Sequence, residues 1–323
     1  MNRKKLRTLF KIIVATAGLV LSVRLIRTVG WEQIRDAFQQ HATALVLMTV
    51  VYLLYHLLRT WTLQICIPYP IRFRSLFPIR LAGEAVAYLA VGSIIGDAAK
   101  VALAREEIPP VEGATGVFAE KLIYHLSGAA FIMGGLFIGM LQFGASKLLV
   151  IPFGVMLLVF AGFLFLLSSG AKPVSFVLAG LLARKPALLN FLERTEESLF
   201  QFQKNHPAAF LATVALDCLS YLYSVGEVLF ILSILDVPVS FWDIWYFEAI
   251  VKMSNSATMV VPANLGIFET TNLLLARQLG FADEAGMIVA LFVRIRAIVW
   301  CLLGYLCFLL LLKRKAVGNG SAK

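Results

Sequence analysis

Ionisable side chains lie inside apolar segments long enough to cross a membrane, and these residues have the most capacity for chemistry in this chain. A charged side chain at the middle of a bilayer costs about 2.5–3.5 kcal/mol on insertion scales, so each one needs a function or a partner. The acidic members are Glu84, Asp97, Glu120, Asp217, Glu227, Glu248 and Glu269. The basic members are Arg59, Lys100, Lys121, Lys252, Arg294 and Arg296. Such residues bind polar ligands, pair with one another between helices, or lie at the interface with their charged ends in water; the sequence leaves all three interpretations open.

A strong helix interruption lies at Val261-Pro262-Ala263-Asn264-Leu265-Gly266-Ile267-Phe268-Glu269. Proline removes a backbone donor, glycine permits a tight backbone, and the following helix presents its N-terminus at membrane depth. Free N–H groups at a helix start favour a phosphate or a carboxylate, and arginines on the last apolar segment would add full charges. The sequence therefore predicts a substrate-binding group of Pro262, Asn264, Gly266, Glu269, Arg294 and Arg296. A kinked helix sealed by its neighbours is the structural alternative.

A matching group occurs in the first half, at Gly96-Asp97-Ala98-Ala99-Lys100 and Glu120-Lys121. We predict that Asp97, Lys100, Glu120 and Lys121 belong to the same binding site. Lys121 and His125 are four residues apart and so share a helix face. A lone histidine in a membrane is more often a packing residue than a proton relay, and His56 and Arg59 are interpreted with the same caution.

No signature of a hydrolase, a nucleotide-driven pump or a zinc enzyme is present in the sequence: there is no H-E-x-x-H, G-x-S-x-G or G-x-x-x-x-G-K-[ST] pattern. The four histidines are scattered, and the four cysteines form no C-x-x-C pair and are interpreted as small buried hydrophobes. We therefore expect no cofactor, no metal and no catalytic residues.

The composition is that of a membrane protein. Hydrophobic residues make up 60% of the 323 residues and charged residues 15%, and the mean hydropathy is +0.84. A soluble fold could not hide this much apolar surface. The net charge of +10 does not indicate nucleic acid, because Lys and Arg concentrate at the termini and in connecting loops, where they fit cytoplasmic loops and anionic lipid.

Charge and hydropathy predict about six full spans, with both termini in the cytoplasm of a multi-pass protein of the cell (inner) membrane. The expected spans are Phe10 to Ile26, Thr43 to Cys66, Ala114 to Met140, Leu148 to Ser168, Ala208 to Leu235 and Met287 to Leu312. The first is expected to be an uncleaved span and not a signal peptide, because arginines and no cleavage site follow it. A short amphipathic piece is expected at Trp31 to Gln40, and the arginines at 72, 74 and 80 are assigned to an internal loop.

Two segments are expected to enter and leave the membrane on one side, as re-entrant helical hairpins. The first is Leu81 to Ala104, and the second joins Asp243 to Val261 with Ile267 to Gly280. The predicted fold is thus an all-α polytopic membrane protein with an inverted repeat. It forms one transmembrane domain, 1–323, with a first half at about 41–170, a cytoplasmic connector at 171–206, a second half at 207–312 and a basic tail at 313–323. Gly96 followed by Leu103-Ala104-Arg105 resembles Gly266 followed by Leu275-Ala276-Arg277, which is weak support for the repeat.

Over nearly its whole length, the chain resembles the flippase-like transmembrane domain of lysylphosphatidylglycerol synthases. That domain also occurs as stand-alone membrane proteins, including a type associated with hopanoid biosynthesis. The resemblance rests on Gly96-Asp97-x-x-Lys100, Glu120-Lys121, Pro262-x-x-x-Gly266-x-x-Glu269 and Arg294, in that order. The chain departs from the family where Lys100 and Lys121 replace a frequent Arg, where Asn264 replaces a frequent Gly, and where Tyr124 or His125 replaces an acidic residue.

The resemblance implies movement of lipid between leaflets, without the soluble aminoacyl-transferase domain of the large synthases. We expect a transporter of a polar-headed lipid, anionic or of isoprenoid type. The alternatives are a membrane-embedded lipid-modifying transferase, with Glu269 or Asp97 as base, and an accessory factor for such an enzyme. The expected partners are membrane lipid and no nucleic acid, with a homo-oligomer or a lipid-biosynthesis enzyme as further possibilities.

Overall fold

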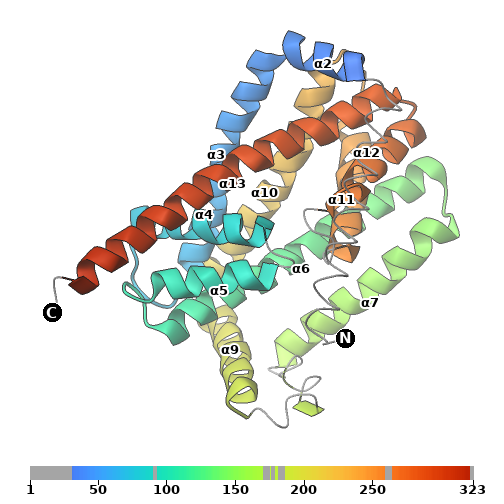
Figure 1. Cartoon of the computed structure of the whole chain (residues 1–323). Coiled ribbons are helices and arrows are strands. Elements are labelled where there is room, and N and C mark those ends of the chain that lie inside the picture. The colour runs from blue at the N-terminus through green and yellow to red at the C-terminus, as the bar shows by residue number, and fades with distance from the viewer. Residues whose placement is uncertain are drawn as a thin grey trace, which may run out of the picture.

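The computed structural model describes residues 31–89, 93–169, 175, 179–180, 186–258 and 264–320, and every regular element within them is a helix (Figure 1). The helices of the first half are α2 (Trp31–Gln40), α3 (Ala42–Cys66), α4 (Phe73–Leu89), α5 (Ser93–Ala104), α6 (Pro110–Phe143) and α7 (Lys147–Ser169). Those that follow are α9 (Pro186–Asn205), α10 (Pro207–Ile234), α11 (Phe241–Ala257), α12 (Ile267–Gln278) and α13 (Asp283–Gly320). The all-α prediction is therefore confirmed for these residues. The expected first span, Phe10 to Ile26, lies outside them.

Four of the described helices are long and apolar enough to cross a membrane: α3, α6, α10 and α13 over Asp283–Lys313. They contain 25, 34, 28 and 31 residues, against about 20 needed for a bilayer. Each of the four matches a span expected from the sequence. Pro110 and Pro207 stand at the first positions of α6 and α10, where a missing N–H leaves no bond unmade. The expected span Leu148 to Ser168 corresponds to the helix α7. Its apolar part, Lys147–Gly162, is shorter than the four helices above.

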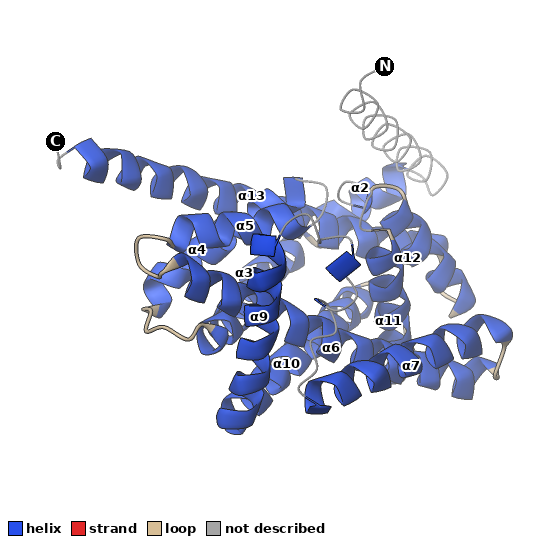
Figure 2. Cartoon of the chain, turned by 90° about the horizontal axis from the view of Figure 1, so that it is seen from below, coloured by secondary structure: helices blue, strands red, loops and turns tan. Residues whose placement is uncertain are grey.

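Two pairs of short helices have matching lengths. The first members, α4 and α11, have 17 residues each, and the second members, α5 and α12, have 12 each. A helix of 12 residues is about 18 Å long, too short for a hydrocarbon core of about 30 Å. The two pairs occupy opposite sides of the molecule (Figures 1 and 2).

The first pair begins earlier than the sequence indicated. Helix α4 starts at Phe73 and not at Leu81, so Arg74 and Arg80 belong to a helix and not to an internal loop. The assignment to a loop was wrong because counting positive charges treats each arginine as solvated, whereas Arg80 is buried beside His56 and Glu84.

The second pair begins at a capping box before α11. Ser240 Oγ accepts from the Asp243 N–H at 3.2 Å, and Asp243 Oδ2 accepts from the Ser240 N–H at 3.0 Å. Before α12 the chain turns through Asn264, at φ 49°, and Gly266, at φ 78°. Left-handed geometry of this kind favours glycine and is tolerated by asparagine, which explains both residue types at this break.

Each helix pair packs on the other half of the chain: α4 packs on α13, and α11 packs on α6. Two glycines permit these close approaches. A Cβ on Gly304 would lie 2.4 Å from the Leu81 carbonyl oxygen, and a Cβ on Gly135 would lie 2.2 Å from the Ala249 Cβ. At the centre, α3 packs on α10, and both contact α6. The two halves are thus interlocked by equivalent contacts.

The core and the outer surface are both apolar. Large side chains such as Phe247, Phe292 and Leu136 are fully buried where α6, α11 and α13 meet. Others, such as Leu148 and Leu158 on α7, are more than 70% exposed. An apolar core inside an apolar surface is the arrangement expected when lipid, and not water, surrounds the helices.

A short amphipathic piece and a cytoplasmic connector were expected in addition to the spans. Helix α2 has the predicted bounds, Trp31–Gln40. Helix α9 forms the last part of the expected connector, and Glu196 on it accepts a 3.0 Å hydrogen bond from the backbone N–H of buried Ser175. Residues 171–174, 176–178 and 181–185 of that connector lie outside the described residues.

Candidate functional site

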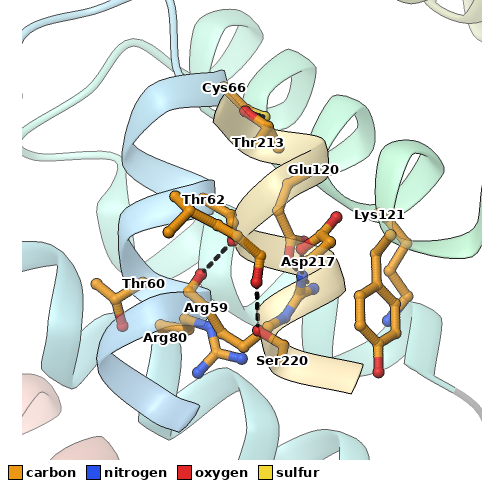
Figure 3. Close-up of polar contacts among 12 residues, drawn as sticks. Arg59, Thr60, Thr62, Cys66, Arg80, Glu120, Lys121, Thr213, Asp217 and Ser220 are labelled. Carbon is orange, nitrogen blue, oxygen red and sulfur yellow. Dashed lines mark hydrogen bonds and ion pairs between the residues drawn. The ribbon is translucent and has the colours of Figure 1, made fainter. Parts of the chain in front are cut away.

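A buried arginine with two carboxylates joins the three central helices. Arg59 of α3 donates through Nη2 to Glu120 of α6 and through Nη1 to Asp217 of α10 (Figure 3). Its guanidinium carbon also lies 3.8 Å from the centre of the Tyr124 ring, in cation–π contact. All three charged side chains are buried, and Asp217 has no exposed surface. We refer to Arg59, Glu120 and Asp217 as the Arg59 triad.

The first helix pair carries a chain of ion pairs that reaches α6. Lys100 of α5 donates to Glu84 of α4 at 2.7 Å and to Asp97 at 3.0 Å. Lys121 of α6 lies 3.6 Å from Asp97 on the other side. Lys100 is buried, whereas 27% of the Lys121 side chain is exposed. These contacts bring together the predicted residues Asp97, Lys100 and Lys121.

Arg80 continues this chain towards α3. Its Nη2 lies 3.8 Å from Glu84 Oε1, and its Nη1 lies 3.1 Å from His56 Nδ1. The His56 ring packs 4.4 Å from the Trp300 ring of α13. We refer to Arg80, Glu84, Asp97, Lys100 and Lys121 as the α4–α5 ion network. Predicted Glu120 belongs to the Arg59 triad and not to this network, although Lys121 is its neighbour in sequence, because adjacent helical residues point in different directions.

In the second half, Glu269 closes the start of α12. Its Oε2 accepts from the Gly266 N–H at 2.8 Å, and its Oε1 lies 2.6 Å from Arg294 Nη2 of α13. Glu269 is 1% exposed and Arg294 is 14% exposed at the side chain. The helix start that the sequence predicted as an anion site is therefore capped by a carboxylate of this same chain, and Arg294 balances that charge.

Asn264 supplies polar groups next to this pair. Its Nδ2 donates to Asn255 Oδ1 at 3.1 Å, and its Oδ1 accepts from Thr258 Oγ1 at 3.3 Å. The amides therefore hold the two sides of the break before α12 together. Pro262, which the sequence placed in the same group, lies outside the described residues.

Arg296 has a different partner from Arg294. It donates to Glu227 of α10, and its guanidinium carbon lies 3.7 Å from the centre of the Tyr52 ring. Residues two apart on a helix point about 200° apart, which explains why the two arginines meet different helices. The sequence did not show which acid each arginine meets; the structure pairs Arg294 with Glu269 and Arg296 with Glu227.

Two adjacent cavities lie against α4 and α13. One, of about 120 Å³, is lined by Tyr88, Asn255, Asn264, Phe268, Val293, Arg294 and Ala297. The other, of about 100 Å³, is lined by Tyr52, His56, Leu81, Glu84, Ala85, Tyr88, Ala297, Trp300 and Cys301. Tyr88 and Ala297 are walls of both. The two cavities are therefore adjacent, with Arg294 of the second half on the wall of one and Glu84 of the first half on the wall of the other.

The arrangement can bind ions and hydrogen-bonding groups. Arginine presents several N–H donors to an oxyanion, and the two asparagine amides offer both donors and acceptors. Among the described residues, no group of three or more His, Cys, Asp or Glu side chains could hold a metal ion. The donors and acceptors of the cavities suit recognition of a charged or polar group.

Several residues of these clusters were absent from the predicted site. His56, Arg59, Glu84, Asp217 and Glu227 were visible in sequence only as polar side chains within apolar segments. Their partners on other helices lie 16 to 158 positions away in the sequence. His125, in contrast, is exposed on α6.

Comparison with known proteins identifies the family. A family model described as "Lysylphosphatidylglycerol synthase TM region" matches residues 8–304. Searches of curated proteins and of solved structures find no match. The matched range includes both helix pairs, the Arg59 triad and the Arg294–Glu269 pair. The chain therefore belongs to the family of the lysylphosphatidylglycerol synthase transmembrane region.

Proposed function

We propose that this protein moves a polar-headed lipid, anionic or of isoprenoid type, between the leaflets of the cell (inner) membrane. The observation that carries the proposal is the pair of adjacent cavities that share Tyr88 and Ala297, because they place Arg294, Glu84 and two asparagine amides within a bundle surrounded by apolar side chains. A lipid headgroup needs such polar groups in order to cross, since an unsolvated charge in hydrocarbon is costly. Its hydrocarbon tails can remain in the surrounding lipid.

Arg294 is the residue best placed to receive the headgroup. It lines the larger of these two cavities, and its partner Glu269 is held by the Gly266 N–H. A phosphate that enters the cavity would compete with Glu269 for the guanidinium, which binds either oxyanion with two N–H groups. The asparagine amides of the same cavity would then contact the rest of the headgroup.

The helix pairs provide a two-sided architecture in this proposal. We take α4–α5 and α11–α12 as re-entrant hairpins of an inverted repeat, with both termini in the cytoplasm. The two pairs have matching lengths, and each packs on a helix of the other half of the chain, α4 on α13 and α11 on α6, which supports this interpretation. Alternating exposure of the cavities to the two membrane faces would then move the headgroup across.

The transferase alternative has less support. A general base needs an oxygen that is free to accept a proton from the substrate. Both oxygens of Glu269 are engaged, by Arg294 and by Gly266, and Asp97 lies between Lys100 and Lys121. We therefore assign these carboxylates to holding basic groups in position.

The test is lipid translocation by purified protein in liposomes. Fluorescent phosphatidylglycerol in the outer leaflet is bleached by an impermeant reductant, and the rate at which protected lipid becomes reactive is followed. Wild-type protein is expected to raise this rate above that of empty liposomes, and Arg294→Ala to lower it at least tenfold. Arg277→Ala is the matched control, because Arg277 forms an exposed ion pair with Asp283.

Mass spectrometry of the liposome lipids completes the experiment. Unchanged lipid masses are expected. New covalent lipid species would identify a transferase, and a wild-type rate equal to that of empty liposomes, across phosphatidylglycerol and an isoprenoid phosphate, would refute the transport proposal.

A further inference from the structure

The charges of the Arg59 triad and of the α4–α5 ion network balance only when the two clusters are added together. The Arg59 triad contains one basic and two acidic side chains, which gives it a charge of −1 when all are ionised. The α4–α5 ion network contains three basic and two acidic side chains, which gives +1. The two clusters together are neutral. In the second half, Arg294 and Glu269 form one balanced pair, and Arg296 and Glu227 form another.

This balance has a consequence for an anionic ligand. A headgroup with one negative charge that enters the cavities leaves the enclosed groups with an excess charge of −1. An uncompensated charge in a medium of low dielectric is strongly unfavourable. Binding of the anion is therefore favoured when a positive charge enters with it.

Asp217 is the place where that charge can be taken up. It is fully buried, and among the carboxylates that the structure describes it is the one with a buried oxygen, Oδ2, that lacks a hydrogen-bond partner. Its other oxygen is held by Arg59. Asp217 is the eleventh residue of the 28-residue helix α10, which places it about 15 Å from the helix start.

The groups around Asp217 come from every side of α10. Arg59 and Cys66 of α3 face Asp217. Glu120 and Tyr124 of α6 and Arg80 of α4 also face it, and Cys218 and Tyr221 lie beside it on α10 itself. From α13 and α11, Arg296 and Glu248 lie near Glu227, ten residues and about 15 Å further along α10. From the α9 side, Lys204 and His206 are exposed next to the start of α10. Among the described residues, Arg59 is thus the cation in direct contact with Asp217.

We propose that Asp217 binds a proton when an anionic headgroup occupies the cavities, so that the protein carries the lipid anion and a proton together. An O–H bond forms between Oδ2 and a proton taken from water on the side where the lipid enters. The same bond breaks when the lipid leaves on the other side. One proton accompanies each negative charge of the headgroup, and this inference rests on the proposed lipid transport.

Proton uptake is measured in liposomes that contain a pH-sensitive dye in their lumen. Labelled phosphatidylglycerol is supplied from outside, and labelled phosphatidylcholine, whose headgroup has no net charge, is the comparison. With wild-type protein, inward movement of phosphatidylglycerol is expected to acidify the lumen. Inward movement of phosphatidylcholine is not expected to change the pH of the lumen. The phosphatidylglycerol rate is expected to fall about tenfold per pH unit at the alkaline end, as for a single required proton.

Asp217→Asn is the test variant, because asparagine has the shape of a protonated aspartate and still accepts from Arg59. It is expected to abolish lumen acidification and to reduce the pH dependence of the rate to less than twofold. Glu120→Gln is a second variant, since it also removes one negative charge from the Arg59 triad. Glu248→Gln is the control: Glu248 is a buried acid that is balanced by Lys252, 3.3 Å away, and this variant should keep lumen acidification.

Infrared difference spectra in lipid nanodiscs supply a readout that does not depend on transport. Addition of phosphatidylglycerol should produce the C=O band of a protonated carboxylic acid in wild-type protein and not in Asp217→Asn. The proton proposal is overturned if phosphatidylglycerol moves without acidifying the lumen, or if no such band appears. If the band appears but no lipid moves, the result counts against the transport function and still supports a proton site at Asp217.

Discussion

Replacing Glu269 should destabilise the protein in two separable steps. This side chain caps α12 through the Gly266 N–H and pairs with Arg294 of α13. Glu269→Gln keeps a neutral acceptor for the cap but removes the charge that balances Arg294. Glu269→Ala removes both contacts, so the difference between the two variants isolates the cap.

The expected magnitudes follow from burial. Breaking a buried ion pair by neutralising one partner costs about 3–5 kcal/mol. Arg294 has a 14% exposed side chain on a cavity, so we expect Glu269→Gln to cost about 3 kcal/mol, the lower end of that range. Loss of a helix cap costs about 0.5–2 kcal/mol, so Glu269→Ala should cost about 1 kcal/mol more than Glu269→Gln.

The assay is thermal and denaturant unfolding in detergent, with Glu193→Gln on α9 as the control. A double-mutant cycle with Arg294→Gln should give a coupling energy of about 2 kcal/mol, because the second substitution relieves the unbalanced charge. Additivity within about 0.5 kcal/mol would show that the ion pair does not act as argued. In liposomes Glu269→Gln should also transport more slowly than Glu193→Gln, and equal rates at matched protein amounts would remove Glu269 from the site.

Three further predictions concern topology, lipid binding and packing. A cysteine at Gln201, exposed on α9, should resist an impermeant reagent applied to intact cells from the periplasmic side, and strong labelling would contradict a cytoplasmic connector. Arg294→Lys should weaken the thermal stabilisation by phosphatidylglycerol more than Arg296→Lys, because Arg294 lines a cavity whereas Arg296 is buried on Glu227; equal shifts would refute a phosphate contact. Gly304→Ala should cost about 1–3 kcal/mol in unfolding measurements, because its Cβ would meet the backbone of α4, whereas Gly226→Ala has open space and should be neutral or stabilising.

The spans were predictable because each carries its own signal. Apolar runs of about 20 residues determine α3, α6, α10 and α13, and the Pro-to-Gly interruption before α12 determines the break in the second pair. The start of α4 was not predictable, because Arg72, Arg74 and Pro78 together resemble a loop. Pro78 lies in the second turn of α4, where it removes one intrahelical hydrogen bond, and Arg80 is accommodated because His56 and Glu84 lie next to it.

The sequence offered candidate residues for the polar clusters but not their pairing. Charges within apolar segments identified Asp97, Lys100, Glu120, Lys121, Glu269 and both arginines of α13 as candidates. Which acid meets which base depends on the angles at which distant helices cross, and no local pattern contains that information. The assignment of Glu269 to Arg294, and of Glu120 to Arg59 instead of Lys121, therefore required the structure.

The contact between α4 and α13 also has a consequence for the insertion of the protein into the membrane, because the two helices are synthesised at different times. The Leu81 carbonyl meets Gly304, across a separation of 223 residues. At a synthesis rate of roughly 5–20 residues per second, α4 and α5 wait about 10–45 s before the helix that covers them has been made. During that interval Arg80, Glu84 and Lys100 are in the nascent chain without α13 over them. Arg59 and Glu120 can pair early, but Asp217 and α13 arrive late, so the first half must be retained at the insertion machinery or shielded by a chaperone until the last helix is inserted.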